Sequence, residues 1–205
     1  MTGRPAVTPE RHVRSATLKV CGAAVLLVVS GCGDSFGHAR GPMMGGDSGY
    51  HFSAARCAGP SSVPGQRVSV SLSDMGMTRM MDGVAPLGAH MRLAAVPTTV
   101  RAGSVTFVGS NVGWRTHELL VLPLSAGSSA GQRRADADGK VSEEAKVGEA
   151  SRSCAQGTGD GIAAGAVGWT TIALSAGRYE LVCNVRNHYA NGMHQELLVV
   201  RASIP

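Results

Sequence analysis

The sequence predicts an all-β protein built as a β-sandwich, and three observations predict it. The 205-residue chain has 28 glycines and only 4% aromatic residues, a composition that favours turns and strands over long helices. Short apolar runs recur through residues 66–205, and glycine or proline punctuates them. Residues 67–72 alternate strictly between polar and apolar side chains, as expected for a strand with one buried face.

Turn signals divide the domain into seven expected strands. Ala102-Gly103 precedes the third strand, Pro123 ends the fourth, and a turn at residues 175–178 joins the fifth to the sixth. The second strand has the weakest pattern. In chain order, the expected strands are residues 67–72, 91–96, 104–108, 118–122, 169–174, 179–182 and 195–200. Seven short strands separated by turns are typical of a sandwich.

Residues 125–168 interrupt this pattern of short strands and turns, because they are polar, charged and rich in glycine and alanine. We expect a long surface excursion between core strands here, with a turn or short helix near residues 142–146. Glu143 and Glu144 are neighbours in that turn. We interpret them as part of a solvated face and not as a catalytic pair of carboxylates.

The N-terminus has the pattern of an export signal. Four basic residues precede the apolar residues 20–29, which are too short to span a bilayer; they are Arg4, Arg11, Arg14 and Lys19. Small residues then lead directly into Cys32, which resembles the bacterial lipobox, where the cysteine carries the lipid. The alternative is a plain cleaved signal with an incidental Cys32.

This pattern predicts the organisation of the chain and its location. Residues 1–31 are expected to be a lipoprotein signal peptide, and residues 32–65, rich in Gly, Ser and Pro, a flexible tether. Residues 66–205 are expected to form the domain. The protein would then lie in the cell envelope, on the extracytoplasmic face of a membrane, attached through a lipid at Cys32.

The charge of the chain gives no reason to expect a nucleic-acid partner. The formal net charge is +5, from 19 basic and 14 acidic residues. The predicted signal contains four of the basic residues and one acidic residue, so the remainder carries only +2. The basic character therefore belongs mostly to the signal.

The cysteine count leaves one thiol to explain. Cys21 lies in the signal and Cys32 is the lipidation candidate, so Cys57, Cys154 and Cys183 remain. In an oxidising compartment an odd cysteine needs a role. Our hypothesis pairs Cys57 with Cys154 in a disulfide and leaves Cys183 as a functional thiolate.

Cys183, His188 and Met193 share one loop between two expected strands, with the spacing C-x4-H-x4-M. A thiolate, an imidazole and a thioether together suit copper. His117, beside the strand at residues 118–122, offers a second imidazole. These four residues would form a trigonal His2Cys set with methionine as a weak axial ligand, as in type 1 copper centres.

Each candidate ligand has an ordinary structural explanation when it is taken alone. Cys183 could be a buried core cysteine, His188 a surface histidine, Met193 a core residue and His117 the cap of a strand. The four at this spacing, after an export signal, favour copper. His194 is expected to point away from Met193 on the outgoing strand, and Tyr189 to pack near the site without a catalytic role.

Residues 100–122 and 169–200 resemble the cupredoxin family. The C-x4-H-x4-M loop and the N-x-G-x3-H segment ending at His117 are most similar to its sulfocyanin and auracyanin-type members. The resemblance implies a Greek-key β-sandwich, one type 1 copper and outer-sphere electron transfer, with the ligands His117, Cys183, His188 and Met193.

One position departs from the pattern of the family. Many small blue-copper proteins have an asparagine directly after the first histidine ligand, and its side chain ties the two ligand loops together. Here that residue is Glu118. Asn184, which follows Cys183, is an alternative residue for orienting the loop.

These features predict a membrane-anchored electron carrier, not an enzyme, that exchanges single electrons with extracytoplasmic redox partner proteins of a respiratory or other electron-transfer chain. The runner-up is a copper-binding protein for delivery or resistance, which would also use the Met-rich residues 75–81 together with Met43 and Met44. Packing or partner docking is the other interpretation of those methionines.

Three further classes fit less well. A copper oxidase or reductase would need paired His-x-His motifs, and the sequence has none. A dinuclear copper centre for electron entry would need a second cysteine in the loop of Cys183. A metal-free sandwich used for adhesion would leave the complete set of four ligands without a purpose.

Overall fold

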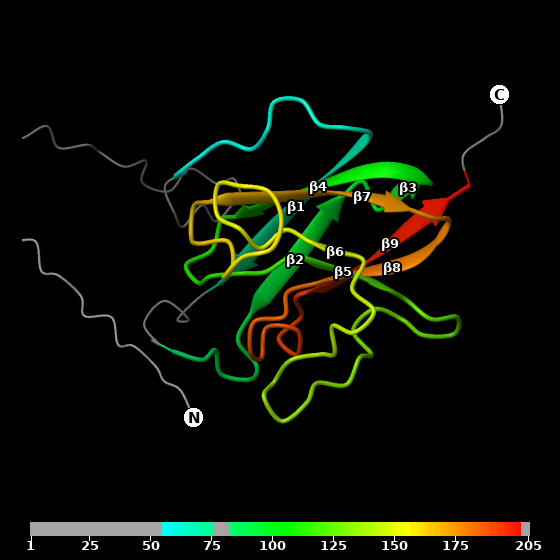
Figure 1. Ribbon diagram of the computed structural model, residues 1–205. Coiled ribbons are helices and arrows are strands. Elements are labelled where there is room, and N and C mark those ends of the chain that lie inside the picture. The colour runs from blue at the N-terminus through cyan, green and yellow to red at the C-terminus, as the bar shows by residue number, and fades with distance from the viewer. Residues whose placement is uncertain (1–54, 76–82, 202–205) are drawn as a thin grey trace, which may run out of the picture. The chain divides into compact units, whose positions relative to one another are not determined.

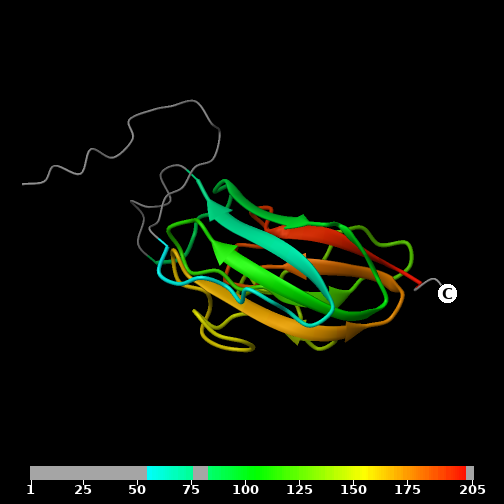
Figure 2. The ribbon, with the colours of Figure 1, turned by 90° about the horizontal axis from the view of Figure 1, so that it is seen from above.

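The computed structural model describes residues 55–75 and 83–201, and it folds them into two β-sheets (Figure 1, Figure 2). One sheet has the strand order β2-β1-β4-β7, with β1 Gln66–Asp74, β2 Met91–Val96, β4 Gly103–Asn111 and β7 Val167–Leu174. The other has the order β3-β9-β8-β5-β6, with β3 Thr99–Arg101, β5 Leu120–Pro123, β6 Gly148–Glu149, β8 Gly177–Val182 and β9 His194–Val200. The described residues contain no helix, so the all-β sandwich is confirmed.

The core lies between the two sheets. Strand β1 buries Val68, Val70 and Leu72 on one face, as the alternating pattern predicts. These side chains belong to the same apolar cluster as Leu181 of β8 and Leu197 of β9. Strands β1 and β4 pair in parallel, as do β3 and β9, whereas the remaining neighbours are antiparallel.

Several boundaries differ from those expected. Strand β1 extends to Asp74, two residues beyond its expected end. Strand β5 starts at Leu120 instead of residue 118, and His117 before it forms only an isolated bridge with Ile162. Strands β3 and β6, with three and two residues, were not expected. Such short edge strands depend on their partner strands more than on their own sequence, so a local pattern does not reveal them.

The interruption at residues 125–168 does more than cross the surface, which corrects the prediction. We call residues 124–147 the outer segment. It covers the face of the β5 and β8 sheet that points away from the core, where Leu120, Leu122, Val141 and Val182 form a second buried cluster with Tyr189. The later part adds Ala150, Ile162 and Ala166 to the main core. The 142–146 stretch is a turn, with the Lys146 amide bonded to the Glu143 carbonyl at 2.8 Å.

The described end of the predicted tether packs against the domain. The Arg56 amide donates to the Gly165 carbonyl at 2.8 Å, and the Thr106 hydroxyl donates to the Pro64 carbonyl at 2.8 Å. A disulfide joins Cys57 to Cys154. Residues 55–65 therefore belong to the packed body. Residues 1–54, with the signal and Cys32, lie outside the described residues, as do residues 76–82 of the Met-rich segment. No described helix is long and apolar enough to cross a membrane.

Candidate metal centre

Three of the predicted ligands meet in the interior at one end of the sandwich. The Nδ1 atoms of His117 and His188 lie 3.2 Å apart, and the Cys183 Sγ lies 3.4 Å from that of His188 and 3.7 Å from that of His117. These three atoms could hold one metal ion. The residues are almost wholly buried, with exposed fractions of 0% for His117 and Cys183 and 2% for His188.

The loop that carries Cys183 and His188 is closed by its own backbone. The Cys183 amide donates to the Met193 carbonyl at 3.0 Å, and the Met193 amide donates to the His188 carbonyl at 3.1 Å. Asn187, with a φ of 67°, takes the left-handed conformation that asparagine tolerates better than most residues. Met193 is fully buried where the loop enters β9, which brings the residue to the same end of the core as the other three candidates.

A second turn places His117. The Asn111 Oδ1 accepts from the Gly113 amide at 2.9 Å, and its Nδ2 donates to the carbonyls of Arg115 and Ile162, both at 2.7 Å. Gly113 is required because a Cβ there would lie 2.1 Å from the Asp74 Oδ1. The N-x-G-x3-H spacing is therefore the sequence pattern of a turn that aims His117 inward.

Asp74 is a residue of the site that the sequence analysis missed. Its Oδ1 lies 3.1 Å from the His117 Nε2 and accepts from the amides of Trp114 at 2.8 Å and Arg115 at 3.1 Å. Its exposed fraction is 0%. The sequence did contain a clue to this residue. Asp74 continues the alternation of Val68, Val70 and Leu72, which places an acidic side chain on the core side of β1.

Burial sets the protonation of the donors. It raises the pKa of the Cys183 thiol to about 12, against the opposing effect of the Glu118 amide, which donates to the Sγ at 3.2 Å. Burial, followed by the charges of His117 and Arg115, lowers the pKa of His188 to about 3. Without metal, the site thus holds a thiol and a neutral His188. Binding of a metal ion to the sulfur must release the thiol proton.

The departure at Glu118 is compensated by other groups. The Glu118 backbone ties the two ligand loops together through its hydrogen bond to Cys183, so the tie does not depend on the side chain. Asn184 binds the Val141 backbone in both directions, at 2.8 and 3.0 Å, and anchors the residue after Cys183. The Glu118 Oε2 is buried and has no hydrogen-bond partner among the described residues, and burial is the main cause of its raised pKa.

The outer segment also holds the ligand loop through Tyr189. The Tyr189 hydroxyl donates to the Glu180 Oε1 at 2.9 Å and accepts from the Arg133 amide at 2.9 Å. The Arg133 guanidinium completes the network with a 2.6 Å bond to the Glu180 Oε2. His194 lies against Tyr189, with ring centroids 5.1 Å apart, and is not part of the metal-binding group.

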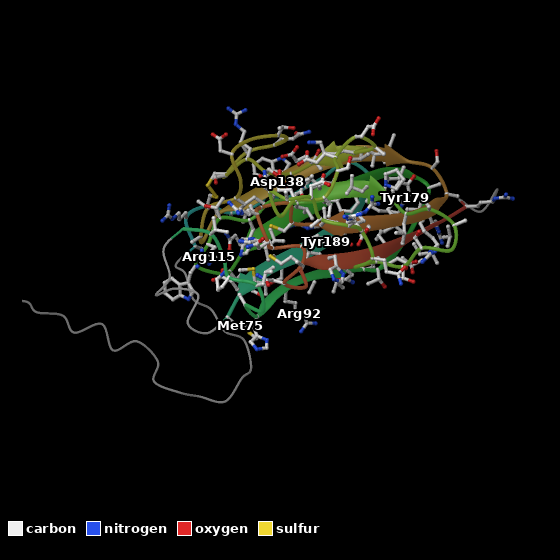
Figure 3. The ribbon with its side chains drawn as sticks, turned by 90° about the horizontal axis from the view of Figure 1, so that it is seen from below. Met75, Arg92, Arg115, Asp138, Tyr179 and Tyr189 are labelled. Carbon is white, nitrogen blue, oxygen red and sulfur yellow. A yellow bond between two sulfur atoms is a disulfide. The ribbon has the colours of Figure 1, made fainter. Side chains whose placement is uncertain are left out.

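The loop is also held on the side of residues 83–90. The Asn187 Nδ2 donates to the Ala85 carbonyl at 2.8 Å, and the Asn191 Nδ2 donates to the Pro86 carbonyl at 2.9 Å. In Figure 3, Arg115, two residues before His117, and Tyr179 lie toward opposite ends of the sandwich. The ligand loop is thus fixed from two sides.

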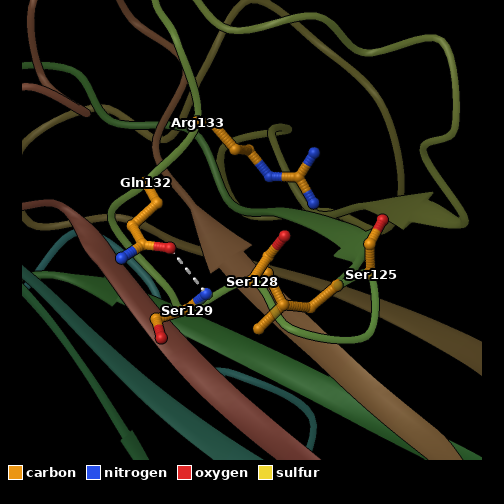
Figure 4. Close-up of a pocket in the computed structure, with 6 residues that line it drawn as sticks. Ser125, Ser128, Ser129, Gln132 and Arg133 are labelled. Carbon is orange, nitrogen blue, oxygen red and sulfur yellow. Dashed lines mark hydrogen bonds between the residues drawn. The ribbon is translucent and has the colours of Figure 1, made fainter.

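A cavity of about 140 Å³ lies apart from these donors, on the outer segment (Figure 4). Its lining is mostly polar and consists of Leu124, Ser125, Ser128, Ser129, Gln132 and Arg133. None of these residues is a histidine, cysteine or acid, so this cavity is not a second metal site.

The set of one cysteine sulfur and two imidazole nitrogens, with Met193 buried where the same loop ends, fits one type 1 copper. The sandwich and its donors are consistent with a cupredoxin. The soft sulfur donors separate this set from the oxygen-rich sites of magnesium or calcium. Closed structural zinc sites use four thiolate or imidazole ligands, whereas the described residues bring three such ligands together.

Comparisons with known proteins found similar structures but no match in sequence. No family model and no curated protein matches the chain. Rusticyanin from Thiobacillus ferrooxidans is 18% identical, with 72% of this chain and 86% of that chain covered and a TM-score of 0.38. Auracyanin A, a "blue" copper protein from Chloroflexus aurantiacus, is 17% identical, with 65% and 98% covered and a TM-score of 0.37. Likenesses this distant do not bear on the function of the chain.

Proposed function

We propose that this chain is a type 1 copper protein that transfers single electrons between redox partners outside the cytoplasm. The observation that carries the proposal is the convergence of His117, Cys183 and His188 in a buried pocket. Met193, buried where the same loop ends, is the proposed axial ligand. Copper bound there would supply the exchange between Cu(II) and Cu(I).

The protein contributes rigidity to this exchange. The ligand loop is bonded to residues 83–90 on one side and to the outer segment on the other. Donors held in this way keep one geometry in both oxidation states, so little rearrangement accompanies the transfer of an electron. The thiol of Cys183 and the neutral ring of His188 are available in the same fixed positions before metal binds.

Burial of the donors favours a carrier over a delivery protein. The histidine and cysteine donors have at most 2% of their surface exposed. Handing copper to an acceptor by ligand exchange requires that the acceptor reach the metal, which these side chains prevent. An electron crosses a few ångströms of packed protein without direct contact. The described residues contain one cluster of potential metal ligands, which also favours a carrier over a copper enzyme with several metal centres.

The test is repeated reduction and oxidation of the copper-loaded protein in the presence of a strong Cu(I) chelator. A carrier keeps its copper through many cycles, and its absorption returns in full after each oxidation. Transfer of copper to the chelator at the first reduction would contradict the carrier and favour copper delivery.

We also propose that the protein acts at the outer face of a membrane, with Cys32 as the lipidated residue. The Cys57–Cys154 disulfide supports an oxidising compartment. Metabolic labelling with a radioactive fatty acid tests the anchor. We expect label in the native protein and none in Cys32→Ala. Equal labelling of both would exclude Cys32 as the attachment point.

A further inference from the structure

A wholly buried carboxylate lies against the outer side of the His117 ring. The Nδ1 of that ring faces Cys183 and His188, whereas its Nε2 lies 3.1 Å from the Asp74 Oδ1. Both side chains have an exposed fraction of 0%. A metal at the donor cluster needs the lone pair of Nδ1, so the ring proton must sit on Nε2, where it donates to Asp74.

The surroundings of Asp74 suit a charged carboxylate. The same Oδ1 accepts from the amides of Trp114 and Arg115, and bonds of this kind favour the ionised form of a carboxylate. Gly113 is part of the arrangement, since any side chain there would overlap this oxygen. The turn before His117 is therefore built around the carboxylate.

We propose that Asp74 is a positioning residue that fixes the tautomer and orientation of His117 and lowers the reduction potential of the bound copper. This inference rests on the proposed copper site. A Cu(II) ion with the Cys183 thiolate leaves one positive charge, which Asp74 balances. Reduction adds one electron to the site close to this carboxylate, and the two negative charges repel. Charges act strongly in a dry interior, so the carboxylate stabilises Cu(II) more than Cu(I).

Asp74→Asn is the variant that tests this inference. Asparagine has the same shape and retains an oxygen that can accept from the two amides and from His117, but it removes the charge. Glu196→Gln is the matched control, because Glu196 of β9 is a partly exposed carboxylate paired with Arg178 of β8. Thermal unfolding of both variants without metal reports whether the fold is kept.

The first readout is the ratio of the Cu(II) affinity to the Cu(I) affinity, obtained from the reduction potential. We expect Asp74→Asn to lower this ratio at least tenfold, which is a rise of about 59 mV for a one-electron couple. The control should leave the potential unchanged. A potential in Asp74→Asn equal to that of the native protein would overturn the electrostatic role.

The second readout needs neither copper nor a variant. Zinc is diamagnetic and prefers nitrogen and sulfur donors, so nitrogen-15 NMR of the zinc-loaded native protein reports the His117 tautomer. We expect a proton on Nε2 that exchanges slowly with water. A proton on Nδ1, or a rapidly exchanging Nε2 proton, would overturn the positioning role even if Asp74→Asn does not fold. Absence of a thiolate–Cu(II) band in the native protein would refute the proposed function instead and would leave this NMR test decisive for Asp74.

Discussion

The thiol of Cys183 has no contact with solvent, and burial raises its pKa to about 12. The thiolate is the form that reacts with alkylating reagents. We therefore expect Cys183 of the metal-free native protein to remain unmodified by iodoacetamide near neutral pH. The same residue should react rapidly in denaturant. Peptide mapping by mass spectrometry measures both, and rapid alkylation in the native state would show that the pocket is open.

Glu118 gives a prediction that depends on pH. Its pKa is raised chiefly by burial, so the carboxyl group is easier to ionise in the unfolded chain than in the folded one. The native protein should therefore lose stability as the pH rises from about 4.5 through the raised pKa, the range in which the unfolded chain ionises first.

Glu118→Gln cannot ionise and should escape that loss. Its stability relative to the native protein should therefore increase as the pH rises from about 4.5, the ordinary pKa of a glutamate, toward neutrality. Urea unfolding of the metal-free proteins at several pH values checks this. A difference in stability that does not change with pH would mean that burial does not raise the pKa of the Glu118 carboxyl group.

The single residues show how far the sequence could lead. His117, Cys183 and His188 were found because the chemistry of copper demands a particular set of side chains, and two of them share one loop. Asp74 was missed because its partner His117 lies 43 residues away, and a contact of that kind leaves no spacing to recognise. Only its place on the core side of β1 marked it.

At the scale of elements, the ligand loop between β8 and β9 is stabilised by the outer segment. Glu180 is fully buried, and Arg133 is the cation paired with it. Arg133→Met leaves that carboxylate buried without a cation, which should cost about 3 kcal/mol. The double variant Arg133→Met/Glu180→Gln removes the charge as well and should recover part of the loss. A double-mutant cycle by urea unfolding measures the coupling, and strictly additive effects would contradict a direct pair.

The outer segment also shows why element-level prediction was incomplete. The core strands have regular patterns because one of their faces packs against a continuous apolar layer. Residues 124–147 form few backbone ladders and attach through single contacts, such as those of Val141 with Asn184 and Gly139 with Asn187. Polar composition predicted an exposed stretch. The sign in the sequence was the uninterrupted apolar run Leu119–Leu122, which is typical of a strand covered on both faces. All four of these residues are buried.

At the scale of the whole molecule, the Cys57–Cys154 disulfide connects the segment before β1 to the region between β6 and β7. The two cysteines are 97 residues apart in the sequence, so the disulfide closes a long loop and restricts the unfolded chain strongly. Replacing both cysteines with serine should lower the free energy of unfolding by about 2 to 5 kcal/mol.

The disulfide should not affect the metal centre, since neither of its cysteines belongs to the donor cluster. We therefore expect the Cys57→Ser/Cys154→Ser variant to unfold at lower temperature while its copper spectrum stays the same. Thermal unfolding and absorption of the copper-loaded variant test the two halves of this expectation. A changed spectrum would mean that the disulfide region is coupled to the ligand loop.

Binding of one copper ion by the Cys183 thiolate and the two histidines is the basis of the proposed function, and the visible spectrum of the Cu(II)-loaded protein reports on it. We predict an intense thiolate-to-Cu(II) band that disappears on reduction, returns on oxidation and is missing from a folded Cys183→Ala variant. A colourless native protein, or a band that persists in Cys183→Ala, would show that copper is not bound in this way.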